Sequence, residues 1–385
     1  MLINANGTHG IVNRVRNALF IYQGWPSVTR DENGTLYAAA SSFRVEHVCP
    51  FGKTAMYISR DEGKTWTPPI VINDTYLDDR DAGILYMGNG RMLVTWFSHP
   101  TKAYLNDYFF GIKNSAQQTE AAPVIGMLSM YQYIPEELSR GGSFIRISED
   151  YGVTWSDTIQ IQVSSPHGPS LCKDGTLVYL GKELFSNTME DPEIPSVVAL
   201  YASTDGGYTW QRRGLCDKPK DLSWDNFHEP HVIELPDGRL FGTIRAEGKD
   251  IQPRFTVYST VSEDGGRTWS EWKPLNVSGS PPHLLLHSSG ALICVVGRRE
   301  APFGQRALVS YDLGETWEDE YILNDRGIDT DLGYPASVEL DDGSIMTVYY
   351  QKYTDENGKT DPKCSILYTK WRLKETSYEK SRTKK

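Results

Sequence analysis

Short apolar runs with alternating polar positions recur along the chain, and glycine-containing turns separate pairs of them. The turns read DENGTL (31–36), GNGRML (88–93), KDGTL (173–177), PDGRL (236–240), SSGAL (288–292) and DDGSI (341–345). Asn-Gly and Asp-Gly between alternating apolar runs are the strongest short signal for a β-hairpin. The pattern therefore predicts six antiparallel hairpins spread over most of the chain.

A second repeated stretch follows a third apolar run in five of these six units. The copies are SRDEGKTW (59–66), SEDYGVTW (148–155), STDGGYTW (203–210), SEDGGRTW (262–269) and SYDLGETW (310–317); the sixth unit has only the strand-like run CSILYTKW (364–371). The Asp can bond backbone amides of its own turn, and the Gly supplies a positive φ. We interpret the stretch as a folding device, because a catalytic site needs one constellation rather than five equivalent ones.

The repeating unit is thus strand, Gly turn, strand, loop, strand, box turn and strand. Four antiparallel strands repeated six times are typical of a β-propeller. We predict an all-β fold, a six-bladed β-propeller with four-stranded antiparallel blades, as a single domain over residues 1–385. The blades span roughly 20–372, and a short basic tail follows at 373–385.

One segment, residues 99–142, interrupts the period before the second box. It contains the aromatic stretch AYLNDYFFGIKN and the stretch IPEELSRGG, in which we expect a helical turn. Insertions of this length inside a compact domain are often functional. The alternatives are a plain surface excursion, a lid over a pocket, or a contact between copies in a homo-oligomer.

Composition and charge narrow the range of partners. The 385-residue chain has a formal net charge of −11, which argues against a nucleic-acid partner because such partners favour a basic surface. No stretch approaches eighteen consecutive apolar residues, so we expect no membrane span. The N-terminal MLINANGTHG shows no signal peptide, which favours a cytoplasmic protein, or a secreted or periplasmic one if a signal was removed. The five cysteines are scattered without a CxxC pair, so we expect no disulfide framework, structural metal or cofactor.

The register of the repeats indicates which side chains meet at the centre of the ring. The start of each inner strand and the loop after each second strand should face one end of the central axis. Arginines clustered beside isolated carboxylates indicate a site for an anionic sugar, with acid and base groups next to it. The candidates at these positions are Trp25, Arg44, Glu46, His47, Arg80, Asp81, His167, His228, Glu229, Arg245, His283, Arg298, Arg299, Arg306 and Tyr334.

The repeated stretches are identified as Asp boxes, and the chain resembles the sialidase (neuraminidase) superfamily of six-bladed propellers. HEPHVIELPDGRLFGTIR (228–245) is similar to the family segment in which a glutamate opens a strand and an arginine closes the hairpin. The resemblance implies that Glu229 activates a tyrosine and that Arg245 binds the substrate carboxylate. DLGYPASVELDDGSIMTVYY (331–350) resembles the segment that carries the nucleophile, which implies that Tyr334 has this role. A tyrosine has a pKa of about 10 and needs such a base near neutral pH.

The resemblance leaves the third substrate-binding arginine open. GRREAPFGQR (297–306) lies where the family carries it, and Arg298, Arg299 and Arg306 compete for the role. The chain also departs from the family at two places. GWPSV (24–28) puts Trp25 where the family has Arg-Ile-Pro, so that Arg44 or Arg80 would have to substitute. The loop SSFRVEHVCPFGK (41–53) lacks the family's acid/base Asp; Glu46 and His47 are its titratable groups, and Asp81 is the other candidate acid.

Three functions remain compatible with these residues. The leading interpretation is an exo-acting glycoside hydrolase of sialidase type, acting on sialic acid or a related acidic sugar in glycans. The main alternative is a polysaccharide lyase, or another hydrolase, acting on uronic-acid sugars; a lyase needs arginine, histidine and tyrosine, and histidines 47, 167, 228, 231 and 283 gather near one face. The third is a non-catalytic glycan-binding propeller. A metal held by the HEPH motif is disfavoured, because His228 and His231 would point to opposite faces of a strand.

Overall fold

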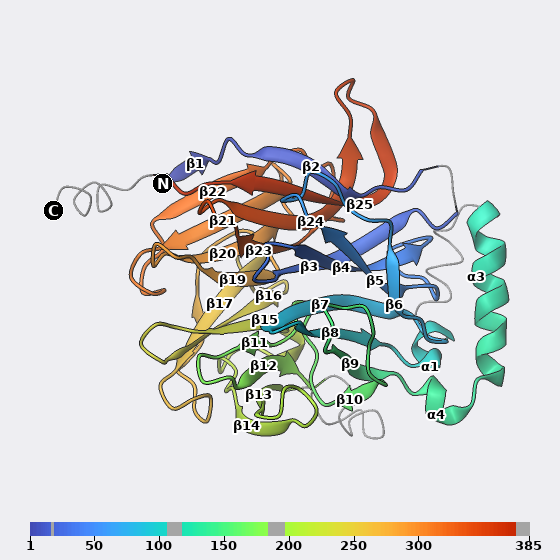
Figure 1. Cartoon of the computed structure of the whole chain (residues 1–385), viewed down its shortest axis with the longest axis horizontal. Helices are drawn as coiled ribbons and strands as arrows, with labels where there is room; N and C mark the ends of the chain where they lie inside the picture. The colour runs from blue at the N-terminus through green and yellow to red at the C-terminus, as the bar shows by residue number, and fades with distance from the viewer. Residues whose placement is uncertain (17–18, 106–117, 184–196, 375–385) are drawn as a thin grey trace.

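The computed structural model describes residues 1–16, 19–105, 118–183 and 197–374, which form a six-bladed β-propeller (Figure 1). These residues make six sheets, numbered here as blades 1–6 in chain order. Strands within each predicted four-stranded unit pair antiparallel, which confirms the predicted all-β fold and blade type. The first strands of most neighbouring blades contact one another, as is typical of the inner strands of a ring.

Each predicted Gly turn joins the first and second strands of one blade. Blade 1 contains β3 (Tyr22–Arg30), β4 (Leu36–Arg44), β5 (Lys53–Ser59) and β6 (Ile70–Asn73); blade 2 contains β7 (Asp79–Gly88), β8 (Arg91–Ser98), β9 (Gly142–Ser148) and β10 (Ile159–Ile161). Blade 3 contains β11 (Ser170–Leu171), β12 (Leu177–Lys182), β13 (Val198–Ser203) and β14 (Gln211–Leu215); blade 4 contains β15 (Phe227–Glu234), β16 (Leu240–Glu247), β17 (Phe255–Ser262) and β18 (Lys273–Pro274). Blade 5 contains β19 (Pro282–Leu286), β20 (Leu292–Arg298), β21 (Gly304–Ser310) and β22 (Asp319–Asn324); blade 6 contains β23 (Gly333–Glu339), β24 (Ile345–Thr354) and β25 (Thr360–Trp371).

Two N-terminal strands complete the ring. β2 (Thr8–Asn13) pairs antiparallel with β25 and is the fourth strand of blade 6, while β1 (Leu2–Asn4) pairs parallel with β22 at the edge of blade 5. The first and last parts of the chain therefore share one sheet, and this covers the edge that β25 would otherwise expose. The span of 20–372 predicted from the repeats did not include these strands, because β2 has no hairpin partner near it in sequence.

The Asp boxes form closed turns with one shared hydrogen-bond pattern. In the fourth box, Asp264 accepts from the backbone N–H of Thr268 at 2.9 Å and from its hydroxyl at 2.7 Å, while Ser262 accepts from Gly266 N–H at 2.8 Å. Trp269 packs against the core shared by blades 3 and 4. The same two hydrogen bonds, from the backbone N–H and the hydroxyl of Thr to the carboxylate of Asp, recur in the boxes of Asp61, Asp150, Asp205 and Asp312.

The insertion at 99–142 forms helices outside the ring, where Figure 1 shows α3 at the right edge of the view. Its elements are α1 (Thr101–Ala103), α3 (Gln118–Met130), the 3₁₀ turn η2 (Tyr131–Tyr133) and α4 (Glu136–Ser139). Val124 and Leu128 of α3 pack against Val45 and Cys49, in the loop that follows β4. The insertion thus supports a loop that carries candidate site residues. Most of AYLNDYFFGIKN falls on 106–117, outside the described residues.

A search of the described helices finds none long and apolar enough to cross a membrane.

Ring closure by β2 gives a direct test. Val12 is 5% exposed and packs in the core with Tyr22 and Ile366, whereas its neighbour Ile11 is 37% exposed. Val12→Asp would leave a buried, unpaired carboxylate and should lower the free energy of unfolding by about 3–5 kcal/mol. Ile11→Asp, the matched control, should cost much less. Equal losses in a urea titration of the two variants would show that β2 does not close blade 6 in this register.

Candidate active site

Four predicted site residues occupy the same backbone position in different blades. Trp25, Asp81, Glu229 and Tyr334 lie near the starts of inner strands with φ values of 53°, 52°, 56° and 48°. The strand register shifts around each of them, as at β-bulges, which re-aim side chains. A left-handed conformation at a non-glycine residue costs on the order of 1–3 kcal/mol and clusters at functional sites. The repeated strain therefore marks one shared site.

The centre of this site is a contact between blades 4 and 6. Tyr334 donates its hydroxyl hydrogen bond to Oε1 of Glu229, and Arg245 donates from Nη1 to Oε2 of Glu229 at 2.7 Å. Arg245 also donates from Nη2 to Glu247 at 2.6 Å. The Tyr334 residue is 5% exposed, and the Glu229 side chain is 16% exposed. The structure thus brings together the three residues that the family resemblance implied, and places Arg245 between two protein carboxylates.

The charges around this contact set the protonation states. Burial would raise the pKa of Glu229, but the Arg245 charge and the hydrogen bond from Tyr334 outweigh it and hold that pKa at about 2. Burial raises the pKa of Tyr334 well above its usual range, and the Glu229 charge adds to this. At neutral pH the site therefore holds a neutral phenol hydrogen-bonded to a carboxylate.

Arg299 is the arginine of the 297–306 segment that approaches the nucleophile candidate. Its guanidinium carbon lies 5.7 Å from the centre of the Tyr334 ring and 5.9 Å from that of Phe255. Its Nε and Nη2 are buried and have no hydrogen-bond partner among the residues that the structure describes. The competing arginines lie elsewhere: Arg298 donates to the carbonyls of Glu300 and Ala301. Arg306 donates to the backbone carbonyls of Gln305 and Asn324, which lie on β21 and β22 of blade 5.

Trp25, at the place of the family's first arginine, lies against two guanidinium groups. The guanidinium carbons of Arg80 and Arg44 are 4.1 and 4.6 Å from its ring centres. Arg44 is fully buried in an ion pair with Asp78 that involves both carboxylate oxygens, and Arg80 donates to Asp78 at 3.3 Å. Tyr104 of the insertion also donates to Asp78, at 2.8 Å. The charge of Arg44 is therefore used inside the protein, where it positions the wall of the site.

Asp81 is a carboxyl group whose pKa is raised to near neutrality by burial. It is 6% exposed, and burial raises its pKa to about 7; the Arg80 charge opposes this shift and the Glu229 charge adds to it. Asp81 and Glu229 thus have pKa values pushed far apart, which is how paired acidic groups take on different roles.

The two candidate residues in the loop after β4, Glu46 and His47, have different partners. His47 has a 42% exposed side chain, and its Nδ1 lies 2.9 Å from Asp331 and 2.9 Å from the Tyr22 hydroxyl. Its ring packs edge-on against Trp25 with 5.0 Å between centroids. Glu46, in contrast, forms an ion pair with Lys363. The structure therefore brings His47, but not Glu46, into contact with the site cluster.

The remaining predicted histidines are mostly structural. His167 and His283 meet His231 in a buried cluster with ring centroids 4.5–5.8 Å apart. Burial lowers the pKa of His167 to about 3 and those of the other two well below the usual value. His228 binds the Asp225 carbonyl at 2.8 Å. No three His, Cys, Asp or Glu side chains within the described part of the chain are arranged to hold a metal ion.

Several residues of the site were not identified from the sequence. Asp78, Asp331, Glu247 and Tyr22 act as partners of the arginines and of His47. Asp78 and Asp331 come just before the inner strands β7 and β23, which carry Asp81 and Tyr334, so the register could have found them. Tyr22 and Glu247 lie within strands that read as ordinary core sequence.

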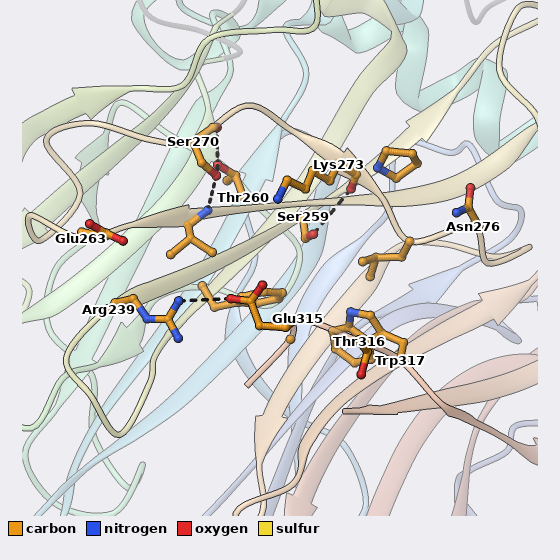
Figure 2. Close-up of a pocket in the computed structure, with 15 residues that line it drawn as sticks. Arg239, Ser259, Thr260, Glu263, Ser270, Lys273, Asn276, Glu315, Thr316 and Trp317 are labelled. Carbon is orange, nitrogen blue, oxygen red and sulfur yellow. Dashed lines mark hydrogen bonds and ion pairs between the residues drawn. The ribbon is translucent and has the colours of Figure 1, made fainter. Parts of the chain in front are cut away.

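An open groove lies away from this site, on the outer side of blade 4 next to the box of blade 5 (Figure 2). Figure 2 shows Arg239 paired with Glu315 across it. Box residues Gly314, Thr316 and Trp317 line it, and none of the sequence-predicted site residues does. We interpret this groove as a product of how adjacent blades pack.

The protonation of Asp81 makes a measurable prediction. Its pKa in the folded state, about 7, exceeds the unfolded value near 4, so the contribution of Asp81 to stability should fall as pH rises from 4 to 7. Asn also tolerates a positive φ, and Asp81→Asn removes this loss. The stability of the variant relative to wild type should therefore rise by up to about 4 kcal/mol over that range. Asp341→Asn, whose parent side chain is 77% exposed, is the control. Parallel pH curves for Asp81→Asn and wild type would contradict a protonated Asp81.

The sequence matches the model of the BNR repeat-like domain over residues 122–347 and that of the BNR/Asp-box repeat over residues 57–68. A comparison with curated protein sequences finds no match.

Solved structures share the fold at low sequence identity. A Dyadobacter fermentans protein of unknown function is 22% identical, with a TM-score of 0.72, 95% of this chain and 98% of that chain covered. The K499G mutant of the Streptococcus pneumoniae NanB sialidase is 13% identical, with a TM-score of 0.66 and coverage of 94% and 70%. A Penicillium chrysogenum alpha-L-arabinanase complexed with arabinobiose is 16% identical, with a TM-score of 0.59 and coverage of 96% and 99%. These likenesses support the fold. Because the first family model spans more than half of the sequence, this chain belongs to the BNR repeat-like domain family.

Proposed function

We propose that this protein is a glycoside hydrolase that acts on an acidic sugar, sialic acid or a related one, with Tyr334 as its nucleophile. The observation that carries the proposal is the hydrogen bond from the Tyr334 hydroxyl to the largely buried carboxylate of Glu229. Two solved structures that are similar to this one belong to glycosidases, a sialidase and an arabinanase. Fold likeness alone does not assign an activity; the contacts of Tyr334 and Glu229 support this one.

The geometry suits a covalent mechanism. As the phenolic oxygen of Tyr334 bonds to the anomeric carbon, the glycosidic C–O bond breaks and the phenolic proton passes to Glu229. Arg245, bound to the same carboxylate at 2.7 Å, keeps Glu229 ionised before this transfer. A neutral nucleophile also avoids the repulsion that a carboxylate would exert on an anionic substrate. Tyrosine nucleophiles are a recognised exception to the usual carboxylate pair of glycosidases.

Arg299 favours an acidic sugar over a neutral one. Its Nε and Nη2 are buried next to the ring of Tyr334, and neither has a hydrogen-bond partner in the described part of the chain. A buried charged donor without a partner is costly, and a substrate carboxylate would satisfy both nitrogens in a bidentate contact. Burial raises the pKa of Asp81 to about 7, and in its protonated form Asp81 can donate a hydrogen bond to the same substrate without repelling it.

The uronate lyase finds less support in the structure. The number of histidines in the sequence favoured a lyase. In the structure, however, His167, His231 and His283 form a buried neutral cluster rather than a set of accessible bases. Product masses distinguish the classes, because hydrolysis adds water to the products and β-elimination does not. A glycan panel containing both sialosides and uronate oligosaccharides therefore tests the reaction class together with the sugar.

Removing the nucleophile gives the sharpest test of this mechanism. With a fluorogenic sialoside, Tyr334→Phe should lower kcat/KM by on the order of 10³ or more. Tyr350→Phe is the matched control, since Tyr350 is likewise buried and its ring lies 5.9 Å from that of Tyr334. Tyr350→Phe should stay within about tenfold of wild type. The mechanism is wrong if Tyr334→Phe turns over the substrate as fast as this control.

Variants of the adjacent residues Arg299 and Arg298 test whether activity depends on a specific contact with the substrate carboxylate or only on positive charge near the site. Arg299→Met should reduce kcat/KM for an acidic glycoside by about 30-fold to several hundredfold, because a charged hydrogen-bond pair is lost. The same change should matter little for a neutral glycoside carrying the same leaving group. Arg298→Met, one residue away, removes the same charge from a side chain that only contacts carbonyls. Equal losses in both variants would refute the assigned role of Arg299.

A further inference from the structure

His47 and Asp331 form a pair that is separate from the hydrogen bond between Tyr334 and Glu229. Oδ1 of Asp331, just before β23, lies 2.9 Å from Nδ1 of His47, and the Tyr22 hydroxyl donates to the same oxygen at 2.9 Å. Asp331 is held ionised, since the hydrogen bond and charge of His47 outweigh the effect of burial and keep its pKa at about 2. A carboxylate at Nδ1 fixes the proton there and leaves the lone pair on Nε2.

The imidazole also has the accessibility that proton exchange requires. Its side chain is 42% exposed, and its Nε2 forms no hydrogen bond with the described residues. Its ring contacts Trp25, whose ring centroid is in turn 6.4 Å from that of Tyr334. Asp81, the other candidate acid, is only 6% exposed. Of these two candidate acids, His47 is therefore the more open one, and Trp25 lies between it and the nucleophile.

We propose that His47 is the acid and base of the glycosidase reaction, and that Asp331 is its positioning residue. The inference rests on the proposed function and assigns a step that it left open. In the first step, Nε2–H of the imidazolium gives its proton to the leaving glycosidic oxygen as the Tyr334–sugar bond forms. In the second, neutral Nε2 takes a proton from water while the water oxygen bonds to the anomeric carbon. The Tyr334 oxygen then leaves and recovers its proton from Glu229.

The surroundings of the pair set the expected pH profile. Burial lowers the pKa of His47 below its usual 6.5, the Arg80 and Arg44 charges act in the same direction, and Asp331 opposes them. His47 must be protonated for the first step, so kcat/KM should decline as pH rises through this lowered pKa. With Asp81 as the acid, the decline would instead fall near pH 7. The charged or titratable groups around the pair are Tyr22, Arg44, Glu46, Arg80, Asp329, Tyr350, Lys352, Lys363 and Cys364.

Leaving-group dependence tests the catalytic role. We would compare His47→Gln with wild type on two glycosides of one acidic sugar, with a nitrophenyl and a methyl leaving group. The methyl glycoside needs protonation, so its kcat/KM should fall by about 10²–10⁴-fold. Nitrophenolate departs without a proton donor, so kcat/KM for the nitrophenyl glycoside should fall by less than about tenfold. His9→Gln, on β2 at the outer edge of blade 6, should change neither rate.

Two outcomes would overturn the assignment. A loss of equal size on both substrates would mean that His47 only supports the structure of the site. The leaving-group pattern appearing in Asp81→Asn, with His47→Gln unaffected, would assign the proton donor to Asp81. Asp331→Asn tests the positioning role: it should move the decline in kcat/KM to lower pH, because the charge that raises the pKa of His47 is lost.

A measurement without substrate separates failure of this inference from failure of the proposed function. Nitrogen NMR of the neutral imidazole should show the proton of His47 on Nδ1 in wild type and a mixture of tautomers in Asp331→Asn. A wild-type Nε2–H tautomer would refute the pair even if glycosides are hydrolysed. If wild-type protein hydrolyses no glycoside in a broad panel while the Nδ1–H tautomer is present, the proposed function fails together with the acid/base role, and the pair remains a structural feature.

Discussion

The largely buried carboxylate of Glu229 is the charge around which the site is organised. It is stabilised by Arg245 and by the hydroxyl of Tyr334, which arrives from a different blade. An isolated charge in this position would be costly, so each of the three groups depends on the other two. Their meeting requires that blades 4 and 6 keep a fixed relation across the ring.

Three features of the chain maintain this relation. The Asp boxes close the outer turns of five blades with the same hydrogen bonds, and β2 joins the two ends of the chain in blade 6. The bulges at the starts of the inner strands then turn Glu229 and Tyr334 toward one another, at φ values that cost free energy. Stability supplied by the repeats at the periphery therefore offsets strain at the centre.

The sequence was informative where local chemistry determines structure. Asp-Gly turns and Asp boxes depend on residues close in the chain, so the six blades could be predicted. Glu229, Arg245 and Tyr334 followed from register and family resemblance, and the structure brings them into contact. Contacts between distant segments could not be predicted in this way. The pairing of β2 with β25 and that of His47 with Asp331 join residues hundreds of positions apart. The choice of Arg299 over Arg298 depended on which side chain is left without a partner, which requires coordinates.

The central claim is that Tyr334 attacks the anomeric carbon. The most direct test is mass spectrometry of the protein after reaction with an acidic sugar that carries fluorine next to the anomeric carbon, which slows release of a covalent intermediate. The account predicts one added glycosyl group, mapped by peptide fragmentation to Tyr334 and absent from Tyr334→Phe. A glycosyl group on Glu229, or hydrolysis with inversion at the anomeric carbon and no adduct, would contradict it.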